Sequence, residues 1–365
     1  MRILLVAGSY PPEECGVGDY SQQLALALDK YTDLEVGVLT GVAAGRPASG
    51  NISLLEVAPN WRLSELPQII RAIRRWGPDL LHVQYPSQGF SGRMPSLLPL
   101  VCRLLGLKVV QTWHEPYSWR EGSLFLMQLL GARGLIFVRP NYLDLMPALF
   151  RKLLRLRPQV FIPSAGALPV SSTDPNLRQR LRQHYMGDFK RLVVFFGFIY
   201  PSKGIESLFE IANPATDMLV IAGGIKDETY TRRLAELART LGWREEQICF
   251  TGFIASHEAS SLLGAADAVV LPFLDGGGEW NTSILSALAQ GTLVITTAVN
   301  PGGDDPTRNL YTAAPSDISE MRAALDRLAG RRVAPSSMDT VWRDIASAHR
   351  AFYQRFRPFG TDKQA

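Results

Sequence analysis

Short apolar runs alternate with longer segments of helical period along most of this chain, and this pattern constrains the fold most strongly. The first run, residues 2–7, is apolar almost throughout, as strands buried on both faces of a sheet are. Further strands are predicted at residues 35–39, 52–57, 80–84, 108–112, 134–138, 159–162, 192–196, 218–222, 247–251, 268–271 and 293–297. Helices are predicted at residues 18–28, 63–76, 95–105, 123–130, 205–211, 229–241, 257–263, 282–289 and 340–356. Alternating strands and helices predict an α/β fold with parallel sheets.

The length of 365 residues corresponds to about two domains. Residues 164–175 are rich in Pro, Ser, Thr and Gly, which is linker composition. We therefore predict two Rossmann-like, doubly wound domains, residues 1–168 and 169–339, facing a shared cleft. The last helical segment carries four aromatic residues, so we expect residues 340–365 to pack back on the first domain.

Composition excludes several other classes of protein. The apolar run at the N-terminus is far shorter than the roughly 20 residues of a membrane-spanning helix, and no basic and apolar leader precedes it. We therefore expect a cytoplasmic protein. The three cysteines are widely spaced and form no Cys-x-x-Cys pair, which argues against a disulfide framework and a zinc site. We expect no metal and no nucleic-acid partner.

The net charge of +4 is unevenly distributed along the chain. Residues 1–165 hold 17 Lys and Arg against 12 Asp and Glu, whereas the remainder holds 21 against 22. Part of the excess lies at Arg151, Lys152, Arg155 and Arg157, which are interleaved with leucines. Such a segment can lie on an anionic membrane surface, on its inner face in the cell. The commoner alternative is a solvated helix whose leucines pack inward.

In open α/β sheets, ligands bind at the carboxyl ends of strands, so the loops there are candidate sites. The loop after the first strand contains Gly16 and Gly18 directly before a predicted helix, where backbone N–H groups can approach an anion. The spacing does not fit the dinucleotide fingerprint, which argues against a nicotinamide enzyme. A turn that merely starts a helix explains the glycines nearly as well.

His114 follows the predicted strand at 108–112, at a carboxyl end where a side chain can donate or accept a hydrogen bond toward a ligand. We interpret it as a functional residue, with a structural histidine as the alternative. A joint metal site with Glu115 is not expected, because neighbouring strand residues point to opposite faces. The other four histidines, including His82 and His349, have no comparable setting in the sequence.

Two loops of the second half carry groups suited to phosphate. Lys203 follows the strand at 192–196 and can neutralise a phosphate charge. The loop with Gly277 and Gly278 leads into a predicted helix. At the start of this helix, Asn281, Thr282 and Ser283 contribute N–H groups and hydroxyls that form a candidate diphosphate cradle. The alternative is a capped helix that binds nothing.

Together these motifs resemble those of the retaining, GT-B-fold glycosyltransferases of family 4. The resemblance covers nearly the whole chain and rests on residues 10–12, Gly16, 113–115, Lys203-Gly204, 222–224, 250–253, 265–268 and 285–291. It implies metal-independent transfer of a hexose or related sugar, with retained configuration and without a cofactor, from a nucleoside diphosphate sugar to a glycan or lipid-linked acceptor. It further implies that Lys203 binds phosphate and that His114 and Glu279 position the donor sugar.

Three positions depart from the pattern of that family. Phe198 stands where an arginine is common, and Gly278 and Ser286 stand where paired glutamates are common. Glu279, one position later, is the candidate replacement for the first glutamate. A catalytically silent module that binds a sugar nucleotide or a glycan is therefore the alternative function. Another enzyme on the same fold, such as a sugar-nucleotide epimerase, is a third.

Overall fold

A computed structural model describes residues 1–43, 50–57, 60–92, 94–171, 175–187, 189–225, 227–278 and 280–357. The chain divides into two compact units. The first comprises Met1–Ser164 together with Asp339–Ala365, and the second comprises Ala165–Met338. The C-terminal segment thus belongs to the same unit as the N-terminal strands.

The first unit is built on a seven-stranded parallel sheet of order β3-β2-β1-β4-β5-β6-β7. Its strands are β1 (Arg2–Val6), β2 (Glu35–Thr40), β3 (Ser53–Glu56), β4 (Leu80–Tyr85), β5 (Val109–Trp113), β6 (Gly134–Phe137) and β7 (Gln159–Phe161). The strand order reverses between β1 and β4. This is the switch point at which open α/β sheets bind ligands.

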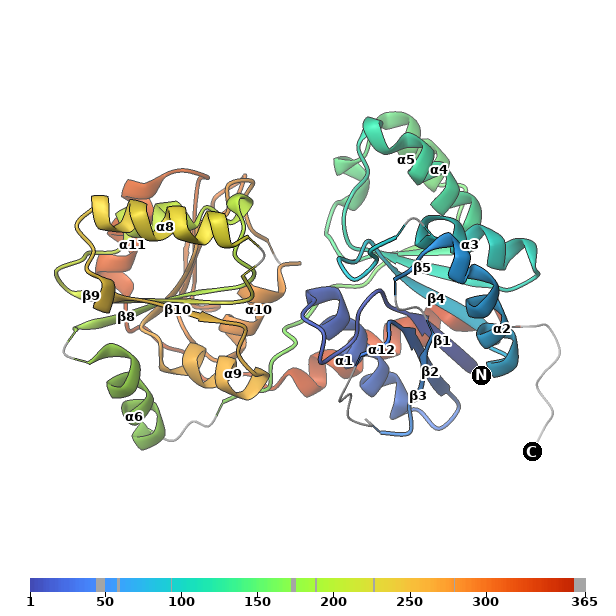
Figure 1. The fold of residues 1–365 in the computed structure, drawn as a ribbon, viewed down its shortest axis with the longest axis horizontal. Coiled ribbons are helices and arrows are strands. Elements are labelled where there is room, and N and C mark those ends of the chain that lie inside the picture. The colour runs from blue at the N-terminus through green and yellow to red at the C-terminus, as the bar shows by residue number, and fades with distance from the viewer. Residues whose placement is uncertain are drawn as a thin grey trace. The chain divides into compact units, whose positions relative to one another are not determined.

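Helices cover both faces of this sheet (Figure 1). One face carries α1 (Gly16–Asp29) and α12 (Met338–Gln354), which meet where the Tyr20 hydroxyl lies 3.5 Å from His349 Nε2. The other face carries α2 (Leu66–Trp76), α3 (Met94–Leu104), α4 (Gly122–Gly131) and α5 (Ala148–Leu154). There the stacked rings of Phe125 and Phe150 join α4 to α5.

The second unit repeats this architecture with the sheet order β10-β9-β8-β11-β12-β14-β13. Its strands are β8 (Arg191–Phe196), β9 (Asp217–Ala222), β10 (Ile248–Gly252), β11 (Ala268–Leu271), β12 (Val294–Thr297), β13 (Gly303–Asp305) and β14 (Leu310–Ala313). All neighbours are parallel except β13, which runs antiparallel to β14 at the edge. The strand order reverses between β8 and β11.

Helices also cover the second sheet on both faces. Contacts group α6 (Pro175–Met186), α9 (Ser256–Ala265) and α10 (Thr282–Ala289) on one face. The other face carries α7 (Leu208–Ile211), α8 (Glu228–Thr240) and α11 (Ile318–Leu328). Beneath them lies one continuous hydrophobic core, which includes Val193, Ile221 and Val270.

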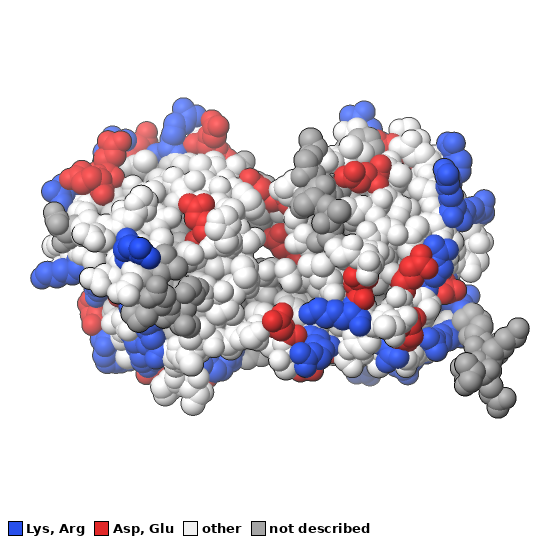
Figure 2. Space-filling view, turned by 90° about the horizontal axis from the view of Figure 1, so that it is seen from below, with Lys and Arg blue, Asp and Glu red and all other residues white. Residues whose placement is uncertain are grey.

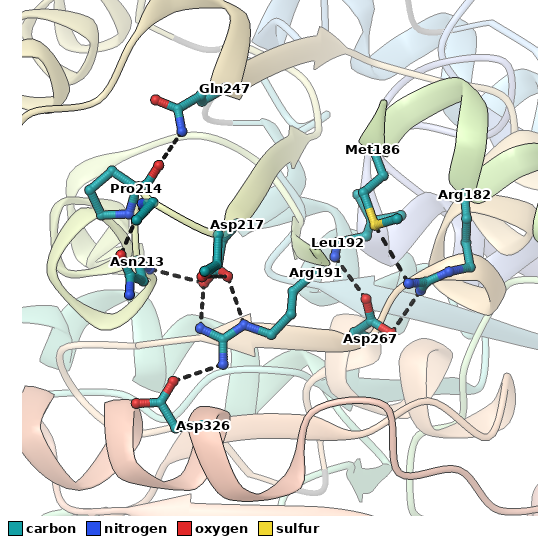
Figure 3. A network of polar contacts seen from close by, with 12 residues as sticks. Arg182, Met186, Arg191, Leu192, Asn213, Pro214, Asp217, Gln247, Asp267 and Asp326 are labelled. Carbon is teal, nitrogen blue, oxygen red and sulfur yellow. Dashed lines mark hydrogen bonds and ion pairs between the residues drawn. The ribbon is translucent and has the colours of Figure 1, made fainter. Parts of the chain in front are cut away.

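Ion pairs tie the amino ends of the second sheet together (Figure 3). Arg191, the first residue of β8, donates two hydrogen bonds, of 2.7 and 2.8 Å, to the buried carboxylate of Asp217 at the start of β9. Arg191 also bonds Asp326 of α11. Before β11, Asp267 accepts from Arg182 of α6 and from the Leu192 N–H. The carboxyl ends of the same strands instead carry the glycine-rich loops.

The predicted fold class, two Rossmann-like parallel-sheet domains, is confirmed. Every predicted strand is present, but β13, β14, α6 and α11 were not predicted, and α5 was considered only as a basic segment that lies on a membrane or forms a solvated helix. Helix α6 begins at Pro175, inside the stretch interpreted as linker, because proline is well accommodated in a first helical turn. Helix α1 begins at Gly16, two residues earlier than expected.

Candidate functional site

The loop after β1 and the loop after β4 pack against each other at the switch point of the first sheet. A Cβ on Gly8 would lie 2.7 Å from the Phe90 N atom, and one on Gly89 would lie 2.4 Å from the Gly8 carbonyl carbon. Glycine at both positions lets the two backbones touch. This contact fixes the path of the chain into α1.

Gly16 and Gly18 lie inside the first turn of α1, not before it. Gly18 is buried, and a Cβ there would lie 3.0 Å from the Ser9 carbonyl oxygen. The N–H groups of Val17 and Gly18 point to the sulfur of Cys15, the N-cap residue. Burial raises the pKa of the Cys15 thiol, but these hydrogen bonds and those of nearby hydroxyls outweigh burial and lower it. The expectation that the backbone at Gly16 and Gly18 approaches an anion stays a prediction.

His114 directly follows β5, and its backbone N–H donates to the Tyr85 carbonyl of β4. Its ring Nε2 lies 3.0 Å from Gln84 Oε1, and its ring meets that of Tyr20 edge-on at 5.2 Å. Burial, followed by the charges of His349 and Arg139, lowers the pKa of His114 to about 3. The imidazole is therefore neutral at physiological pH and can act as a hydrogen-bonding group rather than as a cation.

Two histidines whose position in the sequence indicates no function are neighbours of His114. His82 of β4 and His349 of α12 are fully buried, with ring centroids 5.6 Å apart. Strand alternation could have indicated His82, since His82 and Gln84 lie two residues apart and share a face of the sheet. No local pattern could have placed His349 there, because it comes from the far end of the chain. Glu115 points elsewhere and pairs with Arg139.

Lys203 and the glycine-rich loop meet at the switch point of the second sheet. Lys203 follows β8, and its Nζ lies 4.6 Å from the ring centroid of Phe273, which follows β11. Gly204 has φ of 65°, and a Cβ there would lie 2.2 Å from the Pro272 carbonyl oxygen. Two strands adjacent in space but distant in sequence therefore place an ammonium group beside the glycine-rich loop.

The expected diphosphate cradle at α10 is partly wrong. The Asn281 side chain caps the helix and accepts from the N–H groups of Ser283 at 3.0 Å and Ile284 at 3.4 Å. The Ser283 N–H is therefore engaged by the cap, in line with the preference of asparagine for the N-cap position. What remains for a ligand is the Thr282 N–H with the hydroxyls of Thr282 and Ser283.

The loop before α10 is held by packing. The Gly277 N–H donates to the Thr297 carbonyl, and a Cβ at Gly277 would lie 2.8 Å from Ile284 Cδ1. At Gly278 a Cβ would lie 2.1 Å from the Trp280 ring. Gly277 and Gly278 are thus required by the structure itself. Glu279 lies outside the described residues.

The structure also describes the other two positions that depart from the family pattern, Ser286 and Phe198. Ser286 is buried within α10, and a Cβ on Gly166 would lie 3.0 Å from its Cα. The chain at Gly166 thus lies against the position where the family commonly has its second glutamate. Phe198 is partly buried in the loop after β8. Among the residues that the structure describes, no group of three or more His, Cys, Asp or Glu is arranged to hold a metal ion.

Comparison with known proteins gives two family matches and a set of similar structures. The family described as Glycosyltransferase Family 4 matches residues 15–194, and that described as Glycosyl transferases group 1 matches residues 190–331. No curated protein sequence matches the chain.

Three of the similar solved structures extend over the whole chain. A sucrose-phosphate synthase from Thermosynechococcus elongatus is 17% identical with a TM-score of 0.72, covering 97% of this chain and 98% of its own. A glycosyltransferase from Rickettsia africae is 16% identical with a TM-score of 0.68, covering 98% and 99%. Anabaena HepE in complex with UDP and glucose is 16% identical with a TM-score of 0.65, covering 97% and 98%. At these identities the likeness is one of fold.

Proposed function

Because this chain is a glycosyltransferase of the GT-B fold, we propose that it moves a hexose or related sugar from a nucleoside diphosphate sugar to a hydroxyl group. The acceptor is a glycan or a lipid-linked molecule, and the transfer retains the anomeric configuration without a metal. The observation that carries this proposal is the position of the Lys203 ammonium beside Phe273 at the switch point of the second sheet.

The chemistry requires that the negative charge on the departing nucleoside diphosphate be stabilised. Lys203 supplies a positive charge for this purpose, and the Thr282 N–H at the start of α10 adds a helix-terminal dipole. The neutral His114 ring forms a hydrogen bond with a hydroxyl of the donor sugar. The attacking hydroxyl enters on the face from which the diphosphate leaves, which retains the configuration.

The test compares sugar-nucleotide turnover by the wild type and by Lys203→Ala. We expect kcat/KM to fall on the order of 100-fold, as when one preorganised electrostatic group is removed from an active site. Lys190→Ala is the matched control, because Lys190 is exposed and lies beside the opposite end of β8. Equal turnover by wild type and Lys203→Ala contradicts the proposal.

The donor itself is found by thermal shift against UDP, GDP, ADP and TDP sugars, since a ligand that binds the native state raises its stability. Binding without any turnover identifies the catalytically silent module suggested by Phe198, Gly278 and Ser286. Isomerisation of the donor in the absence of an acceptor identifies an epimerase.

We also propose that α5 and the residues after it attach the protein to an anionic membrane surface. The alternative of inward-packed leucines holds only in part: Phe150 and Leu154 are buried, but Leu149 is 52% and Leu156 is 72% exposed. Leu149 lies two residues before the basic residues of 151–157, and Leu156 lies among them. In the view of Figure 2, basic and acidic side chains are intermixed. Among the described residues, none of the helices could span a bilayer.

Vesicle binding tests this attachment. Neutralising Arg151, Lys152 and Arg155 with glutamine should weaken binding to anionic vesicles by at least about tenfold, since each basic residue near such a surface contributes about 1 kcal/mol. The matched control neutralises Arg71, Arg74 and Arg75 of α2, three exposed arginines. Equal wild-type binding to neutral and anionic vesicles refutes the attachment.

A further inference from the structure

A continuous chain of side chains runs from the C-terminal helix to His114. Tyr353 Oη of α12 lies 2.6 Å from His82 Nδ1, and His82 Nε2 lies 3.3 Å from Gln84 Nε2. Gln84 Oε1 in turn lies 3.0 Å from His114 Nε2. Tyr353, His82 and Gln84 are all fully buried.

The Gln84 amide can serve both histidines only in a defined way. The amide oxygen accepts a hydrogen bond and the amide nitrogen donates one. The histidine nitrogen that faces the amide oxygen must therefore carry a proton, and the histidine nitrogen that faces the amide nitrogen must not. With Oε1 toward His114, the His114 ring holds its proton on Nε2. With Gln84 Nε2 toward His82, that ring accepts at Nε2, where the Thr112 hydroxyl, 2.7 Å away, donates as well, and its Nδ1–H donates to Tyr353 Oη. The two rings therefore carry their protons on opposite nitrogens.

This arrangement leaves one atom of His114 for a ligand. Among the residues that the structure describes, the His114 ring makes a single hydrogen bond, which runs from Nε2 to Gln84 Oε1. His114 as a residue is partly exposed, whereas His82 and His349 are fully buried. Nδ1, the remaining ring nitrogen, then bears a lone pair that accepts a hydrogen bond.

We propose that Gln84 is a positioning residue that holds His114 in its Nε2–H form, so that Nδ1 accepts a hydrogen bond from a hydroxyl of the donor sugar. This rests on the proposed function. Because Tyr353 orients His82, which in turn orients Gln84, α12 contributes to the same arrangement. No sequence pattern connects Gln84 with His114, and strand pairing of Gln84 with Thr112 is what places them together.

A matched control lies on the neighbouring strand. Gln111 of β5 is also fully buried and also bridges two groups, accepting from Trp113 Nε1 at 2.8 Å and donating to the Gln128 carbonyl at 2.8 Å. It faces α4, on the opposite side of the sheet from His114. Gln84→Met and Gln111→Met therefore remove equivalent amides, of which only the first touches His114.

The experiment records side-chain ¹⁵N NMR spectra of the full chain labelled at histidine, with His114 assigned by a His114→Gln variant. We expect wild-type His114 protonated at Nε2 and His82 at Nδ1. In Gln84→Met, some or all of the His114 rings should carry the proton on Nδ1 instead of Nε2. Gln111→Met should leave the His114 tautomer unchanged. Gln84→Glu, which keeps an oxygen acceptor, should keep the Nε2–H form.

Steady-state kinetics add a second readout. We expect kcat/KM for the donor sugar to fall about tenfold in Gln84→Met, as for one lost hydrogen bond, and to change less than about twofold in Gln111→Met. A wild-type His114 protonated at Nδ1, or a tautomer that Gln84→Met does not alter, overturns the proposal. Loss of transfer in the wild type itself would instead contradict the proposed function, and the NMR result would still decide the role of Gln84.

Discussion

At the scale of single residues, glycines let neighbouring loops at the carboxyl ends of the strands touch within each unit. Gly204 follows Lys203 directly, and its positive φ lets the chain turn beneath the carbonyl of Pro272. The backbone at this point determines where the Lys203 ammonium lies. The Lys-Gly pair recognised in the sequence is therefore a single structural unit, in which the glycine makes room and the lysine carries charge.

Gly204→Ala should destabilise the second unit strongly. A positive φ costs an alanine roughly 1–2 kcal/mol, and the added Cβ would in addition lie 2.2 Å from a backbone oxygen that cannot move freely. We expect a total loss of about 3 kcal/mol or more in the free energy of unfolding, measured by urea denaturation.

Gly242→Ala provides the comparison. Gly242 has φ of 86°, but nothing lies within 4 Å of a Cβ placed there. Only the conformational cost of roughly 1–2 kcal/mol should then appear. Equal losses of unfolding free energy in both variants would show that the contact with the Pro272 carbonyl adds no cost to an alanine at position 204.

At the scale of elements, the sequence predicted the strands well because each is a short apolar run between polar turns. It also predicted Lys203 and His114 at carboxyl ends, since strand ends are visible in the same pattern. It could not predict which strands are neighbours, and that alone brings Gln84 to His114 and Phe273 to Lys203. These contacts join residues whose separation in the chain carries no local signal.

The histidine cluster joining β4, β5 and α12 should make the first unit sensitive to acid. Burial lowers the pKa of His349 to about 4 and that of His114 to about 3, and it places the pKa of His82 well below its usual value. In the unfolded chain a histidine titrates near 6.5. Between these values the unfolded chain binds more protons, so stability is fully present above about pH 6.5 and falls as the pH drops toward 4.

His349→Gln should remove one of these titrations. The slope of stability against pH below 6.5 should decrease by up to about 1.4 kcal/mol per pH unit, the value for one proton. Hydrogen exchange of β4 and β5 amides, corrected for intrinsic rates, measures the unfolding free energy of this unit. Replacing the exposed His257 of the second unit by glutamine should leave this slope unchanged. An unaltered slope in His349→Gln would contradict the prediction.

At the scale of the whole molecule, the chain leaves the first unit at Ser164, builds the second, and returns at Asp339. The returning helix α12 buries six residues: Trp342, Ile345, Ala346, His349, Phe352 and Tyr353. Arg350 adds an ion pair to Asp33, with nitrogen–oxygen distances near 2.9 Å. Residues 1–164 hold all the strands of the first sheet but not α12, so the first unit is completed only after the second has been synthesised, whereas residues 165–338 form one continuous unit.

The two units should thus differ when each is produced alone. Removing a single buried aromatic side chain costs about 3–5 kcal/mol, and a domain has only about 5–15 kcal/mol in total. Loss of Phe352, Tyr353 and Trp342 together exceeds what the first unit can tolerate. We expect residues 1–164 to be unfolded or aggregated, and residues 165–338 to unfold cooperatively, as judged by circular dichroism during thermal denaturation.

A peptide of residues 339–357 supplied in trans should restore the fold of residues 1–164. The same peptide with Phe352→Ala and Tyr353→Ala should fail, because these two buried rings pack directly on the sheet: Phe352 lies against Gly134 of β6, and Tyr353 lies against His82 of β4. If residues 1–164 fold cooperatively without any peptide, α12 is an accessory rather than part of the core, and its contacts with β4 and β6 contribute far less than their burial indicates.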